Sequence, residues 1–170
     1  MKKIVVVPLS VFVILVVGMS AQAQVPKEGT TSGLFVWNIA PGGTKALQID
    51  KDRSMTVSEM MGLFIGDSPE CILHNASFRC VIYSTITNGF LEDKTMCTFV
   101  RPDSDQIFVM SEGSGQLPAG VKRKHKILGG TGKFTGIQEE GTGQPGPRAR
   151  PAAEGTAQGY GKWTVQYKLP

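Results

Sequence analysis

The chain of 170 residues has the length of one domain preceded by a targeting segment. Its formal net charge is +4, from 18 basic and 14 acidic side chains, which excludes a strongly basic nucleic-acid-binding protein and an acidic solvating chain. The 21 glycines and 10 prolines indicate a chain that turns often, unlike a helical bundle. A chain of about 150 residues buries roughly 70% of its unfolded surface, so we expect one hydrophobic core.

Residues 1–23 have the layout of a secretory signal peptide. Two lysines precede an apolar run over residues 4–18, and small residues near position 23 suit cleavage after Ala23. A transmembrane anchor is the weaker alternative, because the run is shorter than the roughly 20 residues of a membrane span and contains Pro8. We therefore expect a periplasmic or secreted protein with no membrane span after removal of the signal, and a flexible lead-in over residues 24–33.

Short apolar segments separated by turn residues predict strands along the rest of the chain. Asn88-Gly89 is the residue pair that best tolerates the positive φ angles of a type I′ hairpin turn. Residues 141–155 contain repeated Gly and Pro without periodicity, and predict a long loop. Seven to nine regularly spaced strands with no convincing helix predict a sandwich or a closed barrel. The expected strands cover residues 34–39, 54–65, 76–87, 91–100, 106–111, 121–128, 133–138 and 160–169.

The hairpin around Asn88-Gly89 also predicts a disulfide. If these two residues occupy the central turn positions, facing residues have numbers that add to 177, so Cys80 faces Cys97. The pair would be non-hydrogen-bonded, with Cα atoms about 4.5 Å apart, which is at the short end of disulfide geometry. Such a bridge would stabilise the fold by roughly 3 kcal/mol; two buried free thiols are the alternative. Cys71 is then free or pairs with another chain.

Several motifs resemble chemical sites but lack required residues. Residues 129–133 (GGTGK) lack the earlier glycine and the following Ser or Thr of a phosphate-binding loop, and predict a hairpin turn. Residues 103–105 (DSD) lack the later Gly and Glu of a calcium loop, and predict a capped turn. His74 and His125 are too isolated for a zinc site, so each is expected on the surface or in a loop. We expect no metal and no cofactor.

Residues 122–126 (KRKHK) form the one cluster of charge. On a strand, Lys122, Lys124 and Lys126 share one face, while Arg123 and His125 share the other. This pattern favours a solvated outer face of an antiparallel sheet, with a patch for anionic ligands or lipid head groups as the alternative. Nucleic acid is not an expected partner.

Three segments, residues 74–80 (HNASFRC), 103–108 (DSDQIF) and 127–136 (ILGGTGKFTG), together resemble bacterial exported proteins related to the allene oxide cyclase and dirigent barrels. The Gly-Gly-Thr-Gly-Lys-aromatic-x-Gly turn is the most recognisable feature of that family, and residues 159–170 resemble its last strand. Ser104 stands where the family pattern has Gly, and two glutamates follow the turn.

The resemblance covers residues 45–170 and implies an antiparallel eight-stranded, calycin-like barrel with no major helix and an apolar central cavity. Together with the strand pattern, it leads us to expect a single all-β domain over residues 34–170. Plant relatives bind fatty-acid-derived or phenolic molecules and steer cyclisation or radical coupling without a cofactor, and some bacterial relatives cyclise polyketide precursors. No catalytic residue of these enzymes matches a position here.

Three hypotheses follow. The first is an exported barrel that binds a small apolar ligand, with Trp37, Tyr83, Phe108 and Trp163 as candidate lining residues, although core packing accounts equally well for each. The second is a cofactor-free cyclase or isomerase that confines a reactive substrate, with Glu59 as a polarising group or general base unless it faces outward. The third is a filled structural or partner-binding barrel. Enzymatic activity is the less favoured reading, and oligomeric state is left open.

Overall fold

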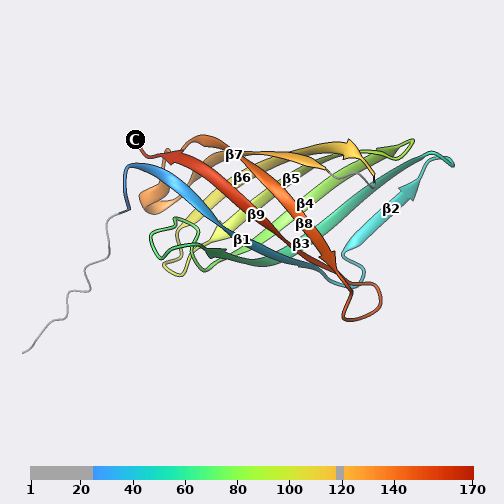
Figure 1. Cartoon of the computed structure of the whole chain (residues 1–170), viewed down its shortest axis with the longest axis horizontal. Coiled ribbons are helices and arrows are strands. Elements are labelled where there is room, and N and C mark those ends of the chain that lie inside the picture. Colours follow the sequence, from blue (N-terminus) through green and yellow to red (C-terminus); the bar gives the residue numbers. More distant parts are fainter. Residues whose placement is uncertain (1–24, 118–120) are drawn as a thin grey trace, which may run out of the picture.

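The computed structural model describes residues 25–117 and 121–170, so the predicted signal peptide lies outside the described residues. These residues form an all-β domain whose only helix, among those described, is the short 3-10 turn η1 (Gly132–Phe134) (Figure 1). No helix in residues 25–117 or 121–170 has the length and apolar character of a membrane span. The strands are β1 (Glu28–Ile39), β2 (Thr44–Gln48), β3 (Arg53–Gly66), β4 (Ala76–Thr87), β5 (Phe90–Val100), β6 (Gln106–Gln116), β7 (Lys122–Gly130), β8 (Glu139–Ala149) and β9 (Ala157–Lys168).

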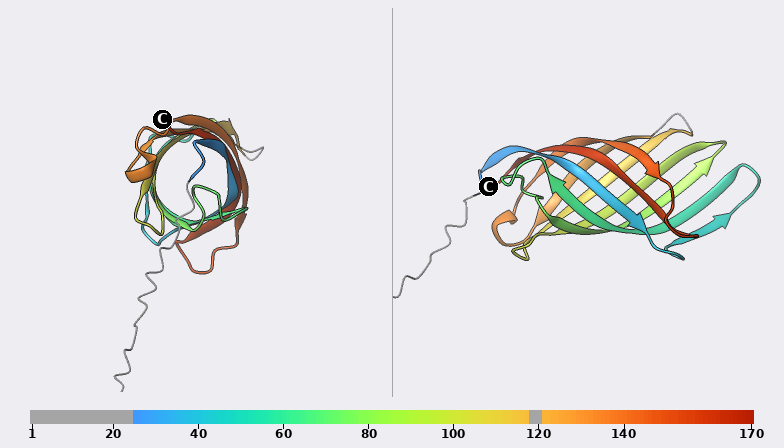
Figure 2. Two further views of the ribbon diagram at one scale, coloured as in Figure 1. Left: turned by 90° about the vertical axis from the view of Figure 1, so that its left-hand side faces the viewer. Right: turned by 60° about the horizontal axis from the view of Figure 1, so that its bottom comes forward.

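Eight strands close into an antiparallel barrel, as predicted. The sheet order runs β1-β9-β8-β7-β6-β5-β4-β3, and β3 pairs back onto β1 from Gly33↔Gly66 to Asn38↔Met61. Viewed along the axis, these strands form a ring (Figure 2, left). The short strand β2 continues beside β3 beyond the end of β1, pairing from Thr44↔Ser58. Closure matters because it provides the first and last strands with partners and so removes the exposed sheet edges.

The central hairpin has the predicted geometry. Asn88 and Gly89 have φ angles of 52° and 75°, which is the left-handed region that a type I′ turn requires. Strands β4 and β5 pair in the register that sets Cys80 opposite Cys97. The two cysteines form a disulfide with Cα atoms 4.1 Å apart, and both face the lumen. The disulfide prediction is therefore confirmed.

Two segments predicted as irregular are strands. β1 begins at Glu28 and pairs with β9 from Glu28↔Lys168 onward, so residues 28–33 of the expected lead-in belong to the barrel. Residues 141–149, expected as part of a long loop, belong to β8 (Glu139–Ala149), which pairs with both β7 and β9. The glycines of β8 are needed there, because a Cβ at Gly141 would lie 2.6 Å from the Val165 side chain. Packing by neighbouring strands thus overrides the weak strand propensity of this segment.

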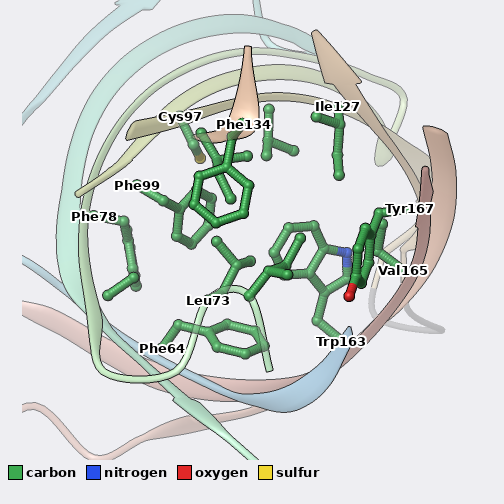
Figure 3. Close-up of a cluster of buried hydrophobic side chains, with 14 of the residues drawn as sticks. Phe64, Leu73, Phe78, Cys97, Phe99, Ile127, Phe134, Trp163, Val165 and Tyr167 are labelled. Atoms are coloured by element: carbon green, nitrogen blue, oxygen red, sulfur yellow. The ribbon is translucent and has the colours of Figure 1, made fainter. Parts of the chain in front are cut away.

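Residues 133–138, by contrast, were expected as a strand and are not one. The chain makes the 3-10 turn η1 and then an irregular segment. Phe134 and Ile137 in this segment are both fully buried, and Phe134 enters the lumen from its end (Figure 3). Their burial at the barrel end, rather than in a sheet, explains why an apolar segment here is not a strand.

Apolar side chains fill one half of the lumen, which we call the closed half. Its end carries both the start of β1 and the end of β9, and the loop over residues 67–75 crosses it (Figures 1 and 2). Trp163 lies within 5.5 Å of the Phe64 and Phe99 rings, centroid to centroid, and Leu73 from the crossing loop packs among them (Figure 3). Phe64, Phe99 and Leu73 are at most 1% exposed. This half of the barrel is a packed core.

Cys71, which lies in the crossing loop, is a free thiol and is buried. The Thr31 hydroxyl donates a hydrogen bond to its Sγ over 3.4 Å and accepts one from the Ile72 backbone N–H over 3.0 Å. A disulfide from Cys71 to another chain would require this loop to leave the barrel end.

Candidate ligand site in the open half of the barrel

The opposite half of the lumen differs in composition and exposure; we call it the open half. Its end carries the turns at residues 49–52, 88–89 and 150–156 (Figure 1, right). Strand alternation directs Ser54 and Thr56 to the same side of β3 as the buried core residue Phe64, yet both remain partly exposed. Side chains that face the lumen and still contact water show that this half is open to solvent.

A row of three polar side chains crosses the open half. Pairing between strands places Thr95 of β5 beside Ser111 of β6, and Ser111 beside His125 of β7. The Ser111 hydroxyl hydrogen-bonds to Nδ1 of His125, and both Thr95 and Ser111 are buried. Burial, together with the nearby positive charge of Arg123, lowers the pKa of His125 to about 4. The imidazole is therefore neutral at pH 7 and has one donor and one acceptor nitrogen.

The next row toward the mouth contains a buried ion pair. Arg123 donates two hydrogen bonds to the Asp93 carboxylate, Nη1 to Oδ1 and Nη2 to Oδ2, each 2.6 Å. Asp93 is on β5 and Arg123 is on β7, so the pair spans β6, where Gly113 lies between them. A Cβ at Gly113 would lie 2.9 Å from Asp93 Oδ1. The bidentate geometry compensates the desolvation of both charges, and the glycine provides the room for it.

Trp163 joins the two halves of the lumen. Its indole stacks with Phe99 in the core, and its ring centroid lies 5.0 Å from that of His125. The imidazole lies over Gly143, where a Cβ would be 2.1 Å from Nε2. The glycine on β8 therefore allows these two rings to meet.

Buried polar atoms without hydrogen-bond partners concentrate near the boundary between the two halves of the lumen. In residues 25–117 and 121–170, four buried side-chain nitrogen or oxygen atoms lack a hydrogen-bond partner, and three of them are Thr95 Oγ1, His125 Nε2 and Trp163 Nε1. Leaving such an atom unsatisfied costs about 1–3 kcal/mol. These three atoms belong to lumen-facing side chains of β5, β7 and β9, so a water or a bound molecule that hydrogen-bonds to them would offset this cost.

The residues predicted to line a cavity separate into two groups. Trp37 and Trp163 face the lumen, and Trp37 packs over Gly159, where a Cβ would lie 2.5 Å from the indole. Tyr83 lies on the outer face and is 42% exposed. Phe108 also faces outward, because its neighbours Ile107 and Val109 face the lumen. Tyr83 and Phe108 therefore do not line the lumen.

Glu59, the candidate general base, also lies outside the lumen. It forms a salt bridge with Arg79 over 2.5 Å on the outer face, and its side chain is 42% exposed. The hydrogen bond that Arg79 Nε donates to the Glu59 carboxylate raises the pKa of the Arg79 guanidinium. This is the outward-facing alternative considered for Glu59 from the sequence, and it separates this carboxylate from any ligand inside the barrel.

His125 was expected on the surface or in a loop and instead lies inside the barrel. The alternation in residues 122–126 had already placed Arg123 and His125 opposite the lysines, which are exposed. The hairpin register likewise places Asp93 and Thr95 on the face of the buried Cys97. Together, these two sequence patterns could have predicted that the polar side chains of β5 and β7 face the lumen.

The glycine-rich turn and the Asp-Ser-Asp turn form one unit at the closed end. The Lys133 ammonium contacts the carboxylates of Asp103 and Asp105, and the Lys133 backbone N–H donates to Asp105 Oδ2 over 3.4 Å. The neighbouring Arg101 guanidinium lies 5.2 Å from the Phe134 ring centroid. Both motifs therefore act structurally, as turns that fix Phe134 in the barrel end. The described residues contain no cluster of three or more side chains suited to a metal ion.

No protein family model, curated protein or solved structure matches the chain. The resemblance to the allene oxide cyclase and dirigent barrels therefore remains a prediction from sequence motifs.

Proposed function

We propose that this protein is an exported binding protein that holds one small, largely apolar molecule with a polar end in the open half of its barrel. The polar end would lie at Thr95 and His125, and the apolar part would pack against Trp37 and Ile82, which are partly buried against the core. The observation that carries the proposal is the cluster of unpartnered buried atoms on neighbouring lumen positions. An eight-stranded barrel has room for side chains or for one small ligand, and here the packed core occupies only one half.

The disulfide supports the location. A bridge between Cys80 and Cys97 persists in an oxidising compartment such as the periplasm or the exterior of the cell. This agrees with the signal peptide that the sequence predicts.

Binding is better supported than catalysis. The carboxylate predicted as a general base, Glu59, is on the outer face. Inside the lumen, Asp93 is held by two hydrogen bonds from Arg123. The low pKa of His125, about 4, makes it a weak base at neutral pH.

Native mass spectrometry of the protein purified from the periplasm of its producing cells tests the proposal. We expect a reproducible small-molecule adduct on the wild-type chain. Thr95→Val removes the unpartnered hydroxyl with little change of volume, and should reduce the adduct at least about tenfold, as loss of one buried hydrogen bond predicts. Thr98→Val, on the outer face of the same strand, is the matched control and should retain it. A wild-type chain without adduct, or equal occupancy in both variants, would contradict the proposal.

A further inference from the structure

The outer surface of the barrel is unusually apolar over β1 and β3. Five large side chains point away from the lumen there and are 37–43% exposed: Leu34, Val36, Met61, Leu63 and Ile65. The strand register places Leu34 beside Ile65 and Val36 beside Leu63, so the side chains adjoin one another across the two strands. Single exposed apolar residues are normal in proteins, but a contiguous set indicates an interaction surface.

The apolar surface continues onto β4 and β5. Val81 and Met96 are each 50% exposed and lie side by side in the β4–β5 pairing. We call these two residues and the preceding five the outer apolar face. At these exposed fractions, the seven side chains present roughly 600 Å² of accessible surface, and the polar residues around them would add to this area. Each partner in a standard protein interface buries roughly 800 Å².

The charges on this surface are balanced. Glu59 and Arg79 lie between Met61 and Val81 on adjacent strands and pair with each other. A strongly acidic or basic partner would therefore find no net opposite charge here, and an anionic lipid surface would find no basic cluster. A second copy of the chain presents the same apolar surface with the same neutral pair, which is the self-complementarity that a symmetric interface requires.

We infer that the outer apolar face is a self-association surface, covered in solution by a second copy of this chain. This inference does not depend on the proposed ligand site. The residues of the face point away from the lumen, so association leaves the open end of the barrel accessible.

Light scattering coupled to size-exclusion chromatography, applied to the mature chain over a range of concentrations, tests the inference. We expect an oligomer for the wild type. Leu63→Arg buries a charge at the centre of the face and should yield a monomer, with the dissociation constant of the oligomer raised at least about a hundredfold. Thr164→Arg places the same charge at an exposed position on β9, outside the face, and should leave the oligomer intact.

Leu63→Thr is a milder variant that keeps strand propensity, in case the arginine disturbs folding, and should raise the dissociation constant at least about tenfold. Circular dichroism and the intact Cys80–Cys97 disulfide check that each variant is folded. A wild-type monomer at every concentration would overturn the inference, as would an oligomer that neither Leu63 variant weakens. Co-sedimentation of a monomer with vesicles of phosphatidylethanolamine and phosphatidylglycerol would assign the face to a lipid surface instead.

Discussion

The closed and open halves of the lumen are built from the same strands but hold opposite chemistry. Along β5, Phe99 lies in the closed half and is 1% exposed, whereas Asp93 and Thr95 lie in the open half and are buried as polar groups. Phe99 contacts four aromatic rings, those of Phe35, Phe64, Phe78 and Trp163, and Thr95 Oγ1 has no hydrogen-bond partner in the described part of the chain. The residues that stabilise the fold and the residues that we propose to bind a ligand therefore lie in different halves of the barrel along its axis. One half provides the core, and the other retains polar groups that still require partners.

The largest expected effect is in the closed half. Phe99→Ala removes a ring that packs against Phe64, Phe78 and Trp163, and should lower the free energy of unfolding by about 4 kcal/mol through lost burial and a residual cavity. Phe90→Ala is the control at the same side-chain size, because Phe90 is 42% exposed and its loss should cost less than about 1 kcal/mol. Urea unfolding measures both. Equal losses would show that the closed half is not the core.

The buried ion pair provides the next test. Arg123→Met leaves the Asp93 carboxylate, whose side chain is 2% exposed, without its partner, and should lower the free energy of unfolding by about 3 kcal/mol. The double variant Asp93→Leu/Arg123→Met replaces both charges by apolar groups and should recover most of that loss. If the double variant is no more stable than Arg123→Met, the penalty does not come from an unpaired charge.

The smallest effect is a pH dependence from His125. Its pKa is about 4 in the folded protein and about 6.5 in the unfolded chain, so only the unfolded chain takes up a proton as the pH falls below 6.5. Stability should therefore decrease with acidification, by about 2 kcal/mol between pH 7 and pH 5. His125→Gln should remove this component, while His74→Gln is the matched control for the only other histidine. A pH dependence that is unchanged in His125→Gln would contradict a buried neutral imidazole.

The positive φ of Ser104, 69°, shows how sequence and structure inform each other. This is the position at which the resemblance leads one to expect Gly, and the backbone adopts the left-handed conformation that glycine favours. The serine accepts a strained conformation, and the turn is maintained by Asp103, whose carboxylate accepts a hydrogen bond from the Asp105 backbone N–H.

Much of the fold could be predicted from the sequence, whereas the polar part of the candidate site could not. Of the four aromatic residues proposed from the sequence as cavity lining, Trp37 and Trp163 lie on the lumen side, whereas Tyr83 and Phe108 face outward. The local sequence around an aromatic residue on a strand looks the same whichever face the side chain is on. The inward- and outward-facing aromatic residues can therefore be told apart only once the barrel has closed. Asp93, Thr95, Ser111 and His125 were missed, because their meeting depends on the register of three strands at once.

By itself, the sequence determined the strand-rich class, the Asn88-Gly89 hairpin and the Cys80–Cys97 bridge. Each depends on alternation and turn chemistry within a few residues of one turn, which local physics decides. Tertiary structure alone decided that the Gly- and Pro-rich β8 is a strand, that Phe134 closes the barrel end and that Arg123 reaches Asp93 across Gly113. These features join segments far apart in the chain, and they exist only once closure of the barrel has determined which side chains share its interior.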